Sequence, residues 1–170
     1  MKMGHVAIAV QDSEGNYRLF SKNGLDEGGK EATISLIGRE FGTESDRGTI
    51  MQEGVQEFLD TPSSNSIEKD QSDYPYYKEA YMIPTTQDQD AVIAQSALDA
   101  ISRPYNLSRD NCAHTVVQAL SAGGVPTIKS PIPMQVAGGL PSAYLSLTVP
   151  KLLYNEIKIN NPGGQTVRPK

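Results

Sequence analysis

Residues 106–114 read NLSRDNCAH and contain Cys112, the only cysteine in the 170-residue chain. Ser108 and Asp110 are residue types that cap helices, and the residues that follow have the apolar spacing of a helix ending at two consecutive glycines. The stretch therefore predicts a helix over about residues 111–122 with a thiol in its first turn. Because the residues just before the thiol are polar, we expect this turn to lie near the surface.

The composition is that of a globular protein. The 170 residues are 38% hydrophobic and 21% charged, so we expect one domain over residues 1–170 with a sizeable core. The net charge of −5 argues against nucleic-acid binding, which requires a basic face. No apolar run is long enough to span a membrane, and a single cysteine cannot form an internal disulfide.

The first part of the chain predicts a β-hairpin followed by less regular structure. Strands are expected at residues 6–10 (VAIAV) and 17–20 (YRLF), which flank a turn. Residues 24–48 are rich in glycine and charge, which favours loop with one short strand at 32–37 (ATISLI). The apolar spacing of residues 50–59 favours a short helix.

The second part alternates strands and helices. Thr86 and Gln89 have the spacing of a capping box at the start of a helix, and Pro104 marks where that helix must stop. The elements expected here are a surface loop at 61–73, a strand at 76–83, helices at 90–102 and 111–122, a strand at 143–148, a helix at 150–159 and a frayed tail from about residue 160.

Cys112 has two alternative interpretations. A free cysteine is usually a small buried hydrophobe. A thiol in the first turn of a helix is also favoured as a thiolate by the helix dipole and the free N–H groups, which makes it a candidate nucleophile. A nucleophilic thiol needs a base, and histidine is a common one.

The chain has two histidines, His5 and His114. His114 is two residues after Cys112 on the same predicted helix, and such side chains point about 200° apart, so it is a poor partner for the sulfur. His5 precedes the first predicted strand, and catalytic Cys and His are commonly brought together by the fold from distant positions. The alternative for His5 is a strand-edge residue or part of a frayed terminus.

A histidine that acts as a base needs a polar group to orient it through its other ring nitrogen. If Gln11 pairs with Tyr17, the hairpin register places His5 opposite Asn23, with Ser21 further along the same face. Asn23 and Ser21 are therefore both candidates for this third group. The alternative is that they form an ordinary exit from the strand into a turn.

Other chemistries lack the residues that they need. One cysteine and two histidines give no zinc-ligand spacing, the paired glycines match no nucleotide-binding loop, and no G-x-S-x-G elbow is present. Asp88 and Asp90 fit the acidic charge of a helix N-terminus better than acid–base catalysis. We expect neither a metal nor a cofactor.

The order of these residues resembles a known arrangement. A histidine on the first strand, a polar residue on the second and a cysteine opening a later helix are similar to the circularly permuted papain-like (NlpC-type) fold. Residues 111–114 (NCAH) resemble the Asn-Cys-x-His box of the lecithin–retinol acyltransferase group. A resemblance to the C-terminal toxin domains of bacterial RHS-repeat polymorphic toxins covers residues 4–8 (GHVAI), 21–24 (SKNG), 81–86 (YMIPTT), 105–106 (YN) ahead of 111–112 (NC), and 161–164 (NPGG).

This resemblance implies an α+β, papain-like domain with a small antiparallel sheet packed against helices. It implies a nucleophile at Cys112, a base at His5 and an orienting group at Asn23 or Ser21. It also implies a cognate immunity protein and delivery into a target cell by a type VI or similar apparatus. Residues 1–5 (MKMGH) do not begin an ordinary signal peptide, an expectation that fits such delivery. The chain carries no RHS repeats, which leaves the delivery route open.

The sequence thus predicts a cysteine hydrolase that acts on an amide or peptide bond, in peptidoglycan or in a target-cell protein. One alternative is an acyltransferase or deamidase that uses the same thiol. The other is a non-catalytic binding domain with Cys112 buried and His5 exposed.

Overall fold

The computed structural model describes residues 5–25, 40–51, 54–61, 77–107, 109–128 and 150–170. The strands predicted at 32–37 and 143–148 lie outside the described residues, as does most of the loop predicted at 61–73. The described strands are β1 (Ile8–Gln11), β2 (Tyr17–Leu25), β3 (Glu40–Met51), β4 (Ala80–Met82), β5 (Tyr105–Asn106) and β6 (Gln165–Val167). The described helices are α1 (Val55–Asp60), α2 (Gln87–Ile101), α3 (Cys112–Ala122) and α5 (Pro150–Asn160).

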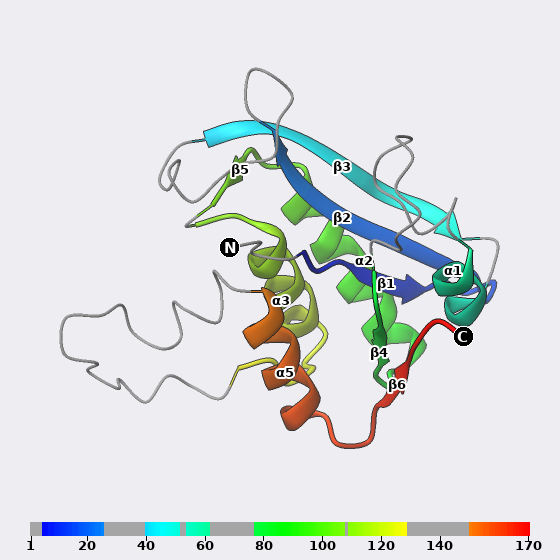
Figure 1. Cartoon of the computed structure of the whole chain (residues 1–170). Helices are drawn as coiled ribbons and strands as arrows, with labels where there is room; N and C mark the ends of the chain where they lie inside the picture. The colour runs from blue at the N-terminus through cyan, green and yellow to red at the C-terminus, as the bar shows by residue number, and fades with distance from the viewer. Residues whose placement is uncertain (1–4, 26–39, 52–53, 62–76, 108, 129–149) are drawn as a thin grey trace.

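The strands form two small antiparallel sheets. The larger has the order β1-β2-β3-β5, and β4 pairs with β6 in the smaller one. Helix α2 packs against the larger sheet, α3 lies beside α2, and α5 lies against α3 (Figure 1). The predicted α+β class is therefore confirmed. Within the described ranges, no helix combines the length and the apolar character needed to cross a membrane.

The main core fills the space between the larger sheet and the helices. Its members are apolar side chains from β1, β2 and all three of the longer helices, including Val10, Phe20, Ile93, Val116, Leu120 and Leu153. Burial of these side chains is the main favourable term that holds α3 against the sheet. The position of the N-terminal end of α3 is thus set by the core of the protein.

The hairpin register is confirmed, since Gln11 pairs with Tyr17. The loop predicted up to residue 48 is wrong where the structure describes it, because residues 40–51 form strand β3. The short helix predicted within residues 50–59 is present as α1, which begins later, at Val55. Strand β3 pairs with β2 from Gly42 opposite Leu25 to Met51 opposite Tyr17, and its register skips one residue at a bulge. Pairing with a distant strand outweighs the local glycine and charge content.

The capping box predicted at Thr86 and Gln89 is confirmed, and helix α2 begins at Gln87, earlier than the predicted start at residue 90. The Thr86 Oγ1 accepts from the Gln89 N–H at 3.3 Å, and the Gln89 side chain accepts from the Thr86 N–H at 3.0 Å. The helix ends at Ile101, just before Pro104. Its last turn therefore lies where β5 and the segment leading to α3 begin.

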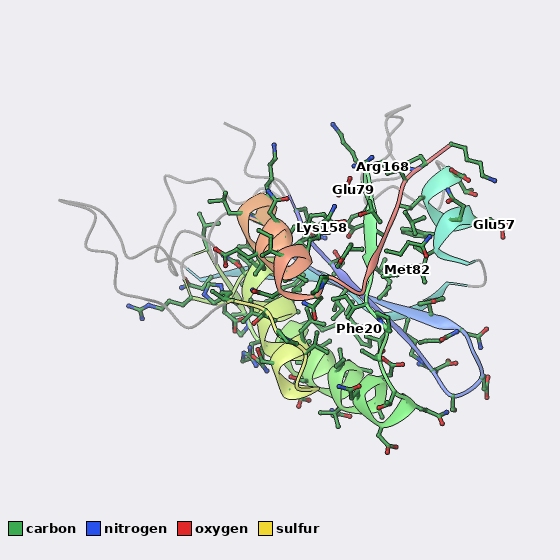
Figure 2. All side chains as sticks on the ribbon, turned by 90° about the horizontal axis from the view of Figure 1, so that it is seen from below. Phe20, Glu57, Glu79, Met82, Lys158 and Arg168 are labelled. Carbon is green, nitrogen blue, oxygen red and sulfur yellow. The ribbon has the colours of Figure 1, made fainter. Side chains whose placement is uncertain are left out.

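The C-terminal segment is ordered as a strand, so the prediction of a frayed tail from residue 160 is wrong. Residues 165–167 form β6, which pairs with β4. Glu79 accepts from Lys158 at 3.2 Å and from Arg168 at 2.9 Å, and Figure 2 shows these three side chains gathered where α5, β4 and β6 approach each other. The Lys170 N–H also donates to Asp60 of α1 at 2.8 Å. Long-range pairing thus holds a polar segment that has no strong local preference.

Candidate active site

The N-terminal end of α3 is capped by Asn111 and not by the predicted residues before it. The Asn111 Oδ1 accepts from the backbone N–H groups of Ala113 at 2.9 Å and His114 at 3.1 Å. Its Nδ2 donates to the Leu107 carbonyl at 2.7 Å. Because Asn111 is buried and its amide makes bonds on both sides, it fixes the first turn of the helix relative to the chain before it.

Asp110, one of the predicted caps, is instead the counterion of a buried lysine. Lys22 on β2 is fully buried, and its Nζ donates to Asp110 Oδ1 and to the Ala100 carbonyl, both at 2.8 Å. The Arg103 Nε donates to the other carboxylate oxygen at 2.6 Å. Burial lowers the pKa of Lys22, and Asp110 partly opposes that shift. This network ties β2 to the end of α2 and to the residue before the cap.

Cys112 is buried, with 5% of its surface exposed, so the expectation of a surface turn is wrong. Burial raises the pKa of the thiol, and the nearby backbone N–H groups of Val6, Ala113 and Cys112 itself act in the opposite direction without overcoming it. The residues just before the thiol are polar for another reason: Asn111 bonds to the backbone and Asp110 bonds to Lys22. Polar residues before a helix therefore did not mean solvent exposure.

His5 is bonded to the second strand of the hairpin. Its Nε2 lies 2.8 Å from the Ser21 Oγ, and Ser21 is fully buried. The extrapolated register had placed Asn23 opposite His5, but β1 begins at Ile8, so residue 5 lies outside the ladder. Asn23 is half-buried on β2, where it pairs with Glu44 of β3.

The fold brings the thiol and the imidazole to the same short segment. The backbone amide of Val6, which directly follows His5, lies close enough to the Cys112 sulfur to lower the pKa of the thiol. His114 is held elsewhere, since its Nδ1 lies 2.9 Å from the Asn111 Oδ1. Cys112, His5 and Ser21 therefore lie in one neighbourhood, while the histidine nearest to the cysteine in sequence bonds to the helix cap.

Tyr77 is a member of this neighbourhood that the sequence interpretation missed. Its hydroxyl donates to the Ser21 Oγ at 3.3 Å, and its ring lies 5.9 Å from the His5 ring. The sequence offers no local signal for this contact, because Tyr77 is 56 residues from Ser21 and sits in an aromatic run that reads as strand. Only the folded arrangement identifies it.

The burial of His5 predicts a loss of stability in acid. Its pKa is lowered by burial from 6.5 to about 4, so between these values the unfolded chain holds a proton that the folded chain lacks. Stability therefore falls as the pH falls through this window, by roughly 3 kcal/mol in full. Denaturant titrations at neutral pH and at about pH 4 should show a smaller pH dependence for His5→Gln than for the wild type. Equal pH dependence would contradict the lowered pKa of the His5 imidazole.

Comparison of the chain with protein-family models, with curated proteins and with solved structures finds no match. Among the described residues, no group of three or more His, Cys, Asp or Glu side chains is placed to hold a metal ion.

Proposed function

We propose that this chain is a papain-like cysteine hydrolase in which Cys112 is the nucleophile and His5 is the base. The observation that supports it most is the position of the only thiol in the first turn of α3, near the backbone amide of Val6, the residue that directly follows a histidine bonded to Ser21. A helix that opens on a thiol and packs beside an antiparallel sheet is also what the papain-like form requires.

The electrostatics favour a neutral pair in the resting protein. Burial raises the pKa of the Cys112 thiol and lowers that of His5 to about 4, so neither group gains from a preformed ion pair. In the proposed reaction the thiol proton passes to His5 as the sulfur attacks the carbonyl carbon. Because Ser21 bonds to Nε2, Nδ1 is the nitrogen assigned to this transfer.

The later steps use the same groups. Attack forms a C–S bond and an oxyanion, for which we propose the Cys112 N–H at the helix start as one donor. The oxyanion collapses, His5 gives its proton to the leaving amine, and an acyl-enzyme remains. Water then attacks the thioester carbonyl while His5 takes a proton from the water. The C–S bond breaks, the carboxylic acid product leaves, and His5 returns the proton to the sulfur, which restores the thiol.

The resemblance to RHS-repeat toxin domains suggests the biological setting. We propose an antibacterial effector that cleaves peptidoglycan or a target-cell protein and is neutralised by an immunity protein. The acyl-enzyme would equally serve transfer to an acceptor other than water, so acyl transfer and deamidation belong to the same proposed chemistry. Expression with and without an export signal separates the targets, since peptidoglycan cleavage requires delivery outside the cytoplasm.

The burial of Cys112 also favours a second candidate, a non-catalytic binding domain in which the thiol is part of the core. Its exposed fraction of 5% is typical of an inert structural cysteine. His5 is not exposed as that alternative predicts, since it is bonded to a fully buried serine. The two candidates therefore differ in whether the reactivity of the Cys112 thiol depends on His5.

Alkylation with iodoacetamide tests this dependence, because the chain has one cysteine and a thiol is the fastest-reacting group; the Cys112→Ala variant measures labelling at other residues. We expect native protein to be labelled, and we expect His5→Gln to slow labelling about 10-fold or more, since a base that helps to remove the thiol proton is lost. Intact-protein mass spectrometry over time measures both rates. His114→Gln is the matched control and should label at the wild-type rate.

An adduct that forms only in denaturant would support the binding domain and exclude the hydrolase. The same conclusion follows if His5→Gln and the wild type label equally fast.

A further inference from the structure

The Ser21 side chain bonds to both His5 and Tyr77. Its side chain is fully buried, and its Oγ lies 2.8 Å from the His5 Nε2 and 3.3 Å from the Tyr77 hydroxyl. A serine hydroxyl has one proton and two acceptor positions. Because Tyr77 donates to this hydroxyl, one acceptor position is taken. The second acceptor position and the hydroxyl proton remain for the His5 Nε2.

Tyr77 also contacts the histidine directly. Its ring centroid lies 5.9 Å from that of His5 with the two planes tilted by 51°. The Tyr77 ring also lies 6.1 Å from that of Phe58, which is buried in α1. Tyr77 therefore packs near a buried aromatic ring and contacts the Ser21–His5 pair at two points, its hydroxyl and its ring.

We propose that Tyr77 is a positioning residue for His5, which acts through the Ser21 hydroxyl and through ring contact to keep Nε2 at Ser21 and to reserve Nδ1 for the Cys112 proton. This inference rests on the proposed function of the Cys112–His5 pair. Tyr77 touches neither the thiol nor a substrate in this scheme.

The hydroxyl contact and the ring contact both favour the protonated form of the His5 imidazole. When His5 takes the thiol proton, it becomes an imidazolium whose Nε2–H must donate, and the second acceptor position of Ser21 receives it. An aromatic ring within about 6 Å favours that cation. If the Tyr77 hydroxyl is lost, the Ser21 side chain is free to rotate and the Nε2 partner is no longer fixed.

Nitrogen NMR of the His5 ring in the Cys112→Ala background tests the positioning without any need for activity. We expect one dominant tautomer, with the proton on Nε2, in the parent protein. Tyr77→Phe should give a mixture of tautomers, and Ser21→Ala should reproduce that mixture because it removes the same link. Tyr17→Phe is the matched control, since Tyr17 packs against the same small apolar cluster as Tyr77.

Rates provide the second readout. In the chain with Cys112 intact, Tyr77→Phe should slow iodoacetamide alkylation about 3- to 10-fold, the range that one net hydrogen bond produces, while Tyr17→Phe should not. A His5 spectrum that is unchanged by Tyr77→Phe overturns the positioning role even if the chain is a hydrolase. If Tyr77→Phe changes the spectrum but His5→Gln and the wild type are alkylated equally fast, the proposed function is overturned and the positioning of the His5 ring by Tyr77 stands.

Discussion

Replacing Cys112 with alanine is expected to lower hydrolysis by at least about 10³-fold, because the nucleophile of the proposed reaction is lost and no second thiol can replace it. The fold should survive, since the change removes one sulfur atom from the first turn of α3, whose cap at Asn111 and whose apolar face are untouched. Release of soluble fragments from purified peptidoglycan, and growth of bacterial cells that express the exported chain, measure the effect.

The matched controls are the two histidines. His5→Gln should approach the effect of Cys112→Ala, because it removes the proposed base. His114→Gln should keep at least about half of the activity, because the His114 ring bonds to the Asn111 cap and has no role in the proposed reaction. Circular dichroism and thermal unfolding confirm that each variant is folded. Retention of hydrolysis and toxicity by folded Cys112→Ala would rule out the thiol as nucleophile.

The parts of the fold that could be predicted from sequence depend on short-range physics. The capping box at Thr86, the stop before Pro104 and the hairpin register at Gln11 each follow from residues within one turn or one hairpin. Strands β3 and β6 could not be predicted, because their polar and glycine-rich sequences become strands only by pairing with distant partners. A local pattern does not contain that information.

The same division holds at the candidate site. The sequence pointed to Cys112 and His5 through a helix start and a resemblance. It left the choice between Ser21 and Asn23 open, because the choice depends on where β1 begins. The role of Asp110 was predicted wrongly for a related reason: whether an acidic residue caps a helix or neutralises a buried lysine is decided by a strand 88 residues away.

The Lys22–Asp110 pair is the electrostatic link between the larger sheet and the start of α3. Lys22 has no solvent exposure, and its ammonium relies on the Asp110 carboxylate and the Ala100 carbonyl at 2.8 Å each. Although burial alone would raise the pKa of Asp110, hydrogen bonds from Arg103 and Lys22 lower it. The carboxylate is therefore charged at neutral pH and compensates a cation that water does not reach.

Asp110→Asn is accordingly expected to destabilise the protein by about 3–5 kcal/mol, the cost of leaving one partner of a buried ion pair uncompensated. Lys22→Met in the Asp110→Asn background should recover a large part of that loss, because it removes the orphaned charge and keeps the volume. Urea unfolding of the four proteins in this cycle measures the coupling. Arg18→Gln is the matched control, since the Arg18 side chain is 45% exposed in its pair with Asp12 and should contribute about 1 kcal/mol or less. If Asp110→Asn proves as mild as Arg18→Gln, Lys22 is neutral in the folded protein, and the link between β2 and α3 rests on apolar packing.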